Sequence, residues 1–134
     1  MWYNNYTREN NLKSIVLPHS IEEIKSKTFY RCESLVDVTI PCSVKKIGSS
    51  AFYICKSINK IIIPDSVTEI ADWAFAYCSS IGKIIIPNSV EAIKEDAFYG
   101  CDNLTIYCEA TEQPDLWEDG WDSGCDVVWG VKHK

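Results

Sequence analysis

The sequence predicts a repeat solenoid: a right-handed superhelix with a parallel β-sheet on one face, short extended or helical turns on the other, and a cap at each end. Three observations predict this fold class. The 134-residue chain matches itself at a shift of 23 residues without any insertion. Each 23-residue unit contains a short β-branched segment that ends at a proline. A coil of this length cannot bury its own apolar side, so such coils are expected to stack in series.

Seven columns of like residues repeat over four units of the chain. Because stacked coils bury a continuous column, we expect these positions to form the core of the solenoid. The columns are Leu12, Leu35, Ile58, Ile81, Leu104; Pro18, Pro41, Pro64, Pro87; Ser20, Ser43, Ser66, Ser89; Ile21, Val44, Val67, Val90; Ile24, Ile47, Ile70, Ile93; Phe29, Phe52, Phe75, Phe98; and Cys32, Cys55, Cys78, Cys101.

Each unit divides into parts with different periods. Residues 35–40 are rich in β-branched side chains and precede a proline, which cannot donate to a ladder, so they are predicted to form a short strand. The equivalent strands end at Leu17, Ile63 and Ile86. A proline-x-serine turn follows, in which the serine hydroxyl can bond to nearby backbone. A second extended piece at 44–47 and a tight turn or single helical turn at 50–55 complete the coil.

The whole chain, 1–134, is predicted to form one domain. Its first part, 1–11, is a degenerate half-coil, because Tyr6 is in phase with the phenylalanine column. Four 23-residue repeats occupy 12–103. After them the proline is lost and the alternation shifts by one residue, so 104–134 is predicted to be the C-terminal cap. A cap is needed at each end because an open sheet edge would pair with other chains.

Composition and charge exclude several classes of protein. Hydrophobic residues make up 46% and charged residues 24%, as in soluble folded domains. The longest aliphatic runs are too short to cross a bilayer, which argues against membrane insertion. Of the net charge of −6, seven acids and no base lie in 109–126, so the remainder holds 12 acids and 13 bases. Without a basic face, the chain is not expected to bind nucleic acid.

The cysteines are expected to be structural. The column cysteines lack the close Cys-x-x-Cys pairs of zinc sites. Parallel stacking places their Cβ atoms about 4.8 Å apart and pointing the same way, which is unfavourable for a disulfide, so we expect buried free thiols. Cys108 and Cys125 form the one pair considered for a disulfide bridge, and Cys42 is expected to be an exposed thiol on a turn.

Neither catalysis nor a cofactor is indicated. His19 and His133 are expected to be solvent-exposed, and no pattern places a base beside a nucleophile. The acidic segment is interpreted as a solvated cap, with a charge-selective contact or a calcium site as alternatives. Its aspartates, Asp119, Asp122 and Asp126, do not match an EF-hand loop. The sequence therefore predicts no catalytic residue, no cofactor and no metal site, and it does not predict an enzyme.

The repeated columns resemble the BspA-like leucine-rich repeat. The motif of that family appears here as Cys55-x-x-Ile58-x-x-Ile61-x-Ile63-Pro64-x-Ser66-Val67-x-x-Ile70-x-x-x-Ala74-Phe75. The resemblance covers about residues 12 to 108, and the tail with Trp117, Trp121, Cys125 and Trp129 resembles the terminal module of bacterial members. It implies a leucine-rich-repeat superhelix and a surface or secreted protein that mediates adhesion. The N-terminus lacks the pattern of a secretory signal, so a cytoplasmic location stays open.

Two surfaces are candidates for binding a partner. The outward strand positions give an apolar row with a second, partly charged row beside it, and β-branched stacking that stabilises the sheet is the alternative interpretation. The first row is Val16, Thr39, Ile62 and Ile85, and the second is Ser14, Asp37, Lys60 and Lys83. A second candidate is the aromatic group near the phenylalanine turn, because large aromatics anchor interfaces. That group consists of Trp73, Tyr77, Tyr53 and Tyr99.

We therefore predict a non-catalytic protein-interaction module that uses the sheet face. The resemblance implies that its partner is a host matrix or cell-surface protein. The alternative is a structural spacer or presentation module of a larger surface protein.

Overall fold

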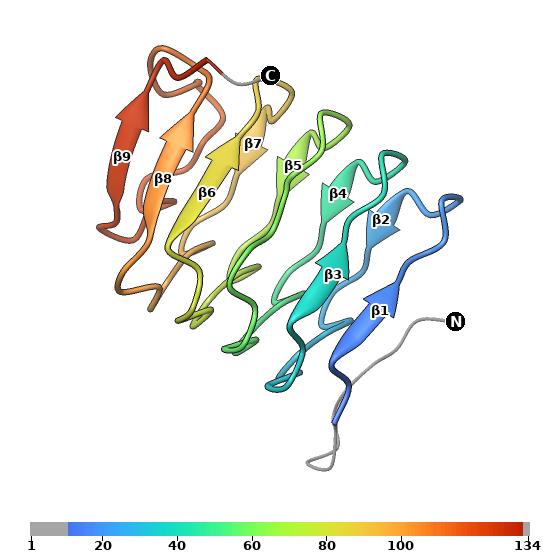
Figure 1. Ribbon diagram of the computed structural model, residues 1–134. Helices are drawn as coiled ribbons and strands as arrows, with labels where there is room; N and C mark the ends of the chain where they lie inside the picture. Colours follow the sequence, from blue (N-terminus) through green and yellow to red (C-terminus); the bar gives the residue numbers. More distant parts are fainter. Residues whose placement is uncertain (1–10, 133–134) are drawn as a thin grey trace.

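The computed structural model describes residues 11–132 and forms a parallel β-solenoid, which confirms the predicted fold class (Figure 1). Most of the predicted N-terminal half-coil lies outside the described residues. Within 11–132 the chain contains strands and turns and no helix, so the turns near the phenylalanines are not helical. The strands are β1 (Ser14–Val16), β2 (Glu23–Ile24), β3 (Asp37–Thr39), β4 (Lys46–Ile47), β5 (Glu69–Ile70), β6 (Lys83–Ile86), β7 (Ala92–Ile93), β8 (Thr105–Cys108) and β9 (Asp126–Trp129).

The second extended piece of each coil builds one uninterrupted sheet. Strands β2, β4, β5 and β7 lie side by side and pair in parallel (Figure 1). Ile24 pairs with Ile47, Ile47 with Ile70, and Ile70 with Ile93, so the pairing register equals the 23-residue period. Strand β4 confirms the second half of the extended piece predicted at 44–47.

The first strand of each coil forms a sheet that is interrupted in the third coil. β1 pairs with β3, and β6 pairs with β8 and β8 with β9, all in parallel. The prediction of a strand that ends at Ile63 is wrong, because 59–63 pairs with neither β3 nor β6. Ile61 and Ile63 are still buried and Ile62 is exposed, so buried and exposed side chains alternate along this segment even without ladder hydrogen bonds. A hollow borders this segment on each side, one next to β3 and one next to β6.

The phenylalanine and cysteine columns form two ladders in the core. The four phenylalanine rings are buried, with successive centroids 5.3, 5.3 and 5.6 Å apart. Each thiol of Cys55, Cys78 and Cys101 donates to a backbone carbonyl of the preceding coil, at 3.0–3.1 Å. These hydrogen bonds join the coils within the core, where the predicted free thiols are confirmed.

Two turn positions in every coil adopt the left-handed conformation. One column is Lys27, Ser50, Trp73 and Asp96, and the other is Arg31, Ile54, Tyr77 and Gly100. Left-handed backbone costs residues with a Cβ about 1–2 kcal/mol, so packing of the coils must hold seven non-glycine residues there.

The C-terminal cap closes the core with tryptophans. Trp117 forms a bridge with Ile93 and so continues the uninterrupted sheet by one position. Trp121 covers the end of the phenylalanine ladder, with its ring centroid 6.3 Å from that of Phe98. Trp117 and Trp121 are both buried and pack edge to face at 4.8 Å, so they shield the last coil from water.

Candidate binding surfaces

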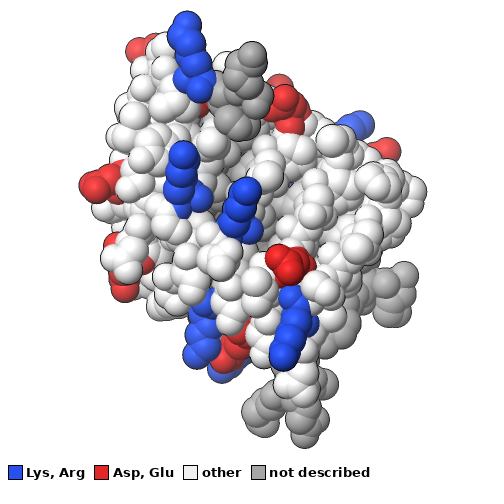
Figure 2. All heavy atoms as spheres, in the orientation of Figure 1, with Lys and Arg blue, Asp and Glu red and all other residues white. Residues whose placement is uncertain are grey.

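The outward positions of the interrupted sheet form an exposed row, which we call the apolar stripe: Val16, Thr39, Ile62, Ile85, Tyr107 and Val128. Val16 is 90% exposed, Ile62 62% and Val128 40%, whereas Ile85 is half-buried. The face carries few charges, among them several lysines (Figure 2). The structure therefore brings the four predicted stripe residues into one row.

Two members of the stripe were missed by the sequence analysis. Tyr107 pairs with Ile85 at a spacing of 22 residues, and Val128 pairs with Tyr107 at a spacing of 21. A search at a fixed 23-residue period cannot find them. The strand-favouring composition of Thr105–Cys108 and Asp126–Trp129, rich in β-branched and aromatic residues, was the signal that could have extended the row.

The predicted lysines lie in the neighbouring row of the same face. Lys60 and Lys83 are exposed, and the Lys83 ammonium lies 5.2 Å from the centroid of the Tyr107 ring. Beside them is a hollow of about 510 Å³ between 59–63 and β6, which we call the lysine hollow. Ile62, Ile85 and the two lysines all line it, so the structure joins these predicted residues in one site.

The predicted aromatic candidates form a separate patch on the turn side. Tyr77 packs edge to face between Tyr53 at 5.7 Å and Tyr99 at 5.6 Å, and Trp73 lies 5.1 Å from Tyr99. Tyr77 and Tyr99 are exposed. None of these four residues lines the lysine hollow, so the predicted stripe and the predicted aromatics belong to different surfaces.

In one coil of the aromatic patch, the tyrosine ring comes from the position next to the tyrosine column and not from the column itself. Tyr30, Tyr53 and Tyr99 belong to one 23-residue column, in which Ala76 takes the third place. Ala76 is fully buried, and the ring of Tyr77 fills the space between Tyr53 and Tyr99. A Cβ on Gly100 would lie 2.5 Å from the Tyr77 ring. The absence of a side chain at position 100 therefore lets Tyr77 complete the patch.

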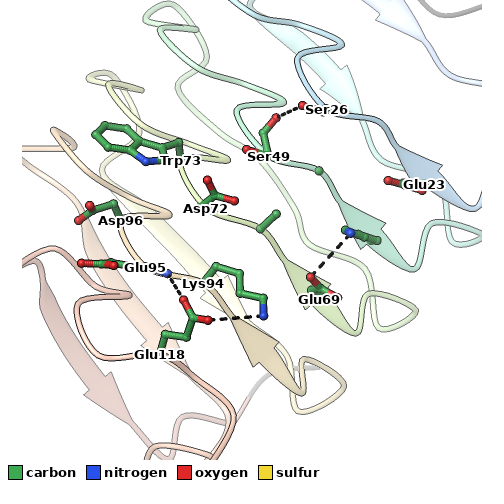
Figure 3. A pocket seen from close by; sticks show the side chains of 13 residues that line it. Glu23, Ser26, Ser49, Glu69, Asp72, Trp73, Lys94, Glu95, Asp96 and Glu118 are labelled. Atoms are coloured by element: carbon green, nitrogen blue, oxygen red, sulfur yellow. Dashed lines mark hydrogen bonds and ion pairs between the residues drawn. The ribbon is translucent and has the colours of Figure 1, made fainter.

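A second hollow, of about 580 Å³, lies over the uninterrupted sheet and is mainly acidic (Figure 3). Lys46 pairs with Glu69 at 3.8 Å, and Lys94 pairs with Glu118 at 3.5 Å. Six acids and two lysines line this hollow, together with Trp73. Sequence reasoning missed it because the charges were summed along the chain, although Asp72, Glu95 and Glu118 share one 23-residue column and Glu23 and Glu69 share another.

The cysteines of the described region are all free. Cys108 and Cys125 are not bridged; Cys125 instead continues the thiol ladder, with its Sγ 3.6 Å from the carbonyl oxygen of Cys101. Burial raises the pKa of Cys101 to about 12 and that of Cys125 to about 11, so both thiols stay protonated near neutral pH. Cys42 is exposed, as predicted.

The structure of residues 11–132 gives little support to metal binding or to catalysis by histidine. No group of three or more His, Cys, Asp or Glu side chains there is close enough to hold a metal ion, so the calcium alternative gains nothing from the structure. His19 is exposed, and His133 lies outside the described residues. The same part of the chain contains no helix able to span a membrane.

The chain is similar to three bacterial proteins of known structure. The leucine-rich repeat protein TpLRR of T. pallidum is 26% identical, with a TM-score of 0.66 over 90% of this chain and 71% of its own. A leucine-rich repeat protein from Bacteroides ovatus is 27% identical, with a TM-score of 0.57 over 75% of this chain and 32% of its own. A leucine-rich cell surface protein from Faecalibacterium prausnitzii is 23% identical, with a TM-score of 0.62 over 90% and 36%.

The chain thus spans about a third of the length of the last two proteins. No curated protein matches it. The model of the BspA-type leucine-rich repeat region matches residues 3–111 in six copies. Together with the buried columns and the parallel coils, this match shows that the chain belongs to the BspA-type leucine-rich repeat family.

Proposed function

We propose that this chain is a non-catalytic protein-interaction module that binds its partner with the face carrying the apolar stripe. The proposed setting is the cell surface or the extracellular space, in adhesion to a host matrix or cell-surface protein. Membership of the BspA-type family supports both parts, because leucine-rich repeats are typically interaction modules and members of this family are often surface-associated.

The exposed apolar stripe is the observation that carries this proposal. The stripe crosses several coils of a rigid scaffold, and its aliphatic side chains at Val16, Ile62 and Val128 remain open to solvent. Exposed apolar side chains gathered on one face cost free energy in water and are typical of protein contact sites. Stacking along the sheet could account for β-branched residues, but it leaves the outer surface of Ile62 uncovered.

The test compares partner capture by the wild-type chain with capture by an Ile62→Ala/Ile85→Ala variant. Both chains are immobilised and exposed to matrix and cell-surface extracts, and retained proteins are quantified. Leu116→Ala is the matched control, because Leu116 is 67% exposed, lies in the cap and is not part of the stripe. Circular dichroism confirms that each variant is folded.

The proposal requires that proteins retained by the wild type and by the Leu116 control are lost with the double variant. Equal capture by all three chains would refute binding through the stripe. That outcome would instead support the spacer function, for which the sheet face makes no contact of its own.

A further inference from the structure

The lysine hollow lies where the sheet is interrupted. No hydrogen bond joins the backbone of 59–63 to β3 or β6, although both strands flank it. The same coil is fully paired on its other side, through β5. Backbone N–H and C=O groups are obligatory hydrogen-bonding groups, and residues 59–63 line the hollow, so a recess that water can enter lies beside Ile62 where a paired strand would otherwise pack.

The lysine hollow differs in charge from the hollow on the other side of 59–63 and from the acidic hollow over the uninterrupted sheet. It is lined by Lys60 and Lys83 and by no acidic residue. Neither lysine takes part in an ion pair within 11–132. The hollow on the other side of 59–63 contains three acids and shares Lys60 as its one lysine, and the hollow over the uninterrupted sheet contains six acids and two lysines. Charge complementarity therefore directs an anionic partner to the lysine hollow.

The spacing of the lining residues matches an extended chain. Lys60 and Ile62 are two residues apart, as are Lys83 and Ile85, and all four side chains face outward. Side chains on one face of an extended segment also repeat every two residues, at about 6.6 Å. A partner segment running along these strands would place one side chain over a lysine and the next over an isoleucine.

We infer that the lysine hollow binds an extended acidic segment of a partner protein in which a Glu or Asp and an apolar residue are two positions apart. The carboxylate pairs with Lys60 and Lys83, and the apolar side chain packs on Ile62 and Ile85. This inference rests on the proposed function of the stripe and adds the chemistry of the partner.

Fluorescence polarisation with labelled nine-residue peptides tests the inference. The first probe carries a central glutamate and a leucine separated by one threonine. In two control probes, lysine replaces the glutamate or serine replaces the leucine. The protein variant is Lys60→Glu/Lys83→Glu, and the matched control is Lys45→Glu, which makes the same charge change at an exposed lysine beside the other sheet. Lys60→Gln/Lys83→Gln separates loss of attraction from added repulsion.

The expected result is binding of the acidic probe to the wild type and to the Lys45 control, weakened by about tenfold or more in the Lys60/Lys83 variants. Both control probes should bind more weakly than the acidic one, and added salt should weaken its binding. Equal binding of the acidic and basic probes, or equal binding by the wild type and the lysine variants, would overturn the inference.

Capture with the same variants separates this inference from the proposed function. If Ile62→Ala/Ile85→Ala loses the captured partners while Lys60→Glu/Lys83→Glu keeps them, the stripe binds proteins and the acidic-segment inference is overturned. If both variants keep every partner, both proposals are overturned. Loss of the partners in both variants, with retention by the Lys45 control, supports both.

Discussion

Replacing Gly100 with alanine should destabilise the protein through the aromatic patch. Gly100 has a φ of +77°, and a Cβ there would lie 2.5 Å from Cδ1 and 2.7 Å from Cε1 of Tyr77. Tyr77 is held between the rings of Tyr53 and Tyr99. The ring therefore cannot move away from the new methyl group without losing these two contacts.

The magnitude follows from three contributions. The left-handed conformation costs a residue with a Cβ about 1–2 kcal/mol. Two edge-to-face aromatic pairs are worth about 0.5–1.5 kcal/mol each. Alanine also restricts the unfolded chain, which returns about 0.4–1 kcal/mol. We expect Gly100→Ala to lower the free energy of unfolding by about 3 kcal/mol.

The measurement is urea denaturation followed by circular dichroism, with Gly82→Ala as the matched control. A Cβ on Gly82 has no neighbour within 4 Å, so that variant should be unchanged or more stable by about 0.4–1 kcal/mol. In a Tyr77→Ala background the clash is absent, and Gly100→Ala should then cost only about 1 kcal/mol.

Two results would refute this reasoning. One is a Gly100→Ala protein as stable as Gly82→Ala. The other is the same cost of Gly100→Ala with and without the Tyr77 ring, since the double-mutant cycle would then show no coupling between the two positions.

Three further predictions concern the core and the interrupted sheet. Phe75→Ala should lower the free energy of unfolding by about 3–5 kcal/mol in the same urea assay, because it removes a buried rung between two stacked neighbours, whereas Phe75→Leu should cost clearly less. Folding raises the pKa of Cys101 from 9.0 to about 12, so its contribution to stability is complete below pH 9 and is lost as the pH rises towards 12. The melting temperature under reducing conditions should therefore fall over this range, and a flatter profile in Cys101→Ala would identify the thiol. Backbone amides of 59–63 should exchange with deuterium faster than those of β5 in the same coil, and equal protection would contradict the interrupted ladder.

The core was predictable because it follows directly from the period. Identical side chains at a spacing of 23 residues must stack if the coils are parallel, and Phe29, Phe52, Phe75 and Phe98 do so. The buried thiols follow from the same stacking. Features that depend on one column alone can therefore be derived from the sequence.

Features that depend on two columns at once were not predictable in this way. Near the phenylalanine turn, Ala76 interrupts the tyrosine column of the sequence, which suggests that a ring is missing there. The ring of Tyr77 occupies that place, because Gly100 has no side chain that would clash with it. The acidic hollow is likewise hidden when charges are summed along the chain, which makes the repeat region nearly neutral. Folding gathers acids from separate coils on one surface while the lysines of the hollow lie on another.

The unpaired segment 59–63 shows why a local preference for strand does not determine the pairing between strands. Residues 61–63 are three consecutive isoleucines, which is a strong preference for strand. Ladder hydrogen bonds also require correct placement of both neighbouring coils, and no residue within 59–63 determines that. The pairing of β5 and the burial of Ile61 and Ile63 hold this coil in the stack without those bonds. The core thus tolerates an unpaired segment on the face where an exposed isoleucine lies beside two lysines that form no ion pair within 11–132. A partner segment that lies over these side chains would therefore leave every core column in place.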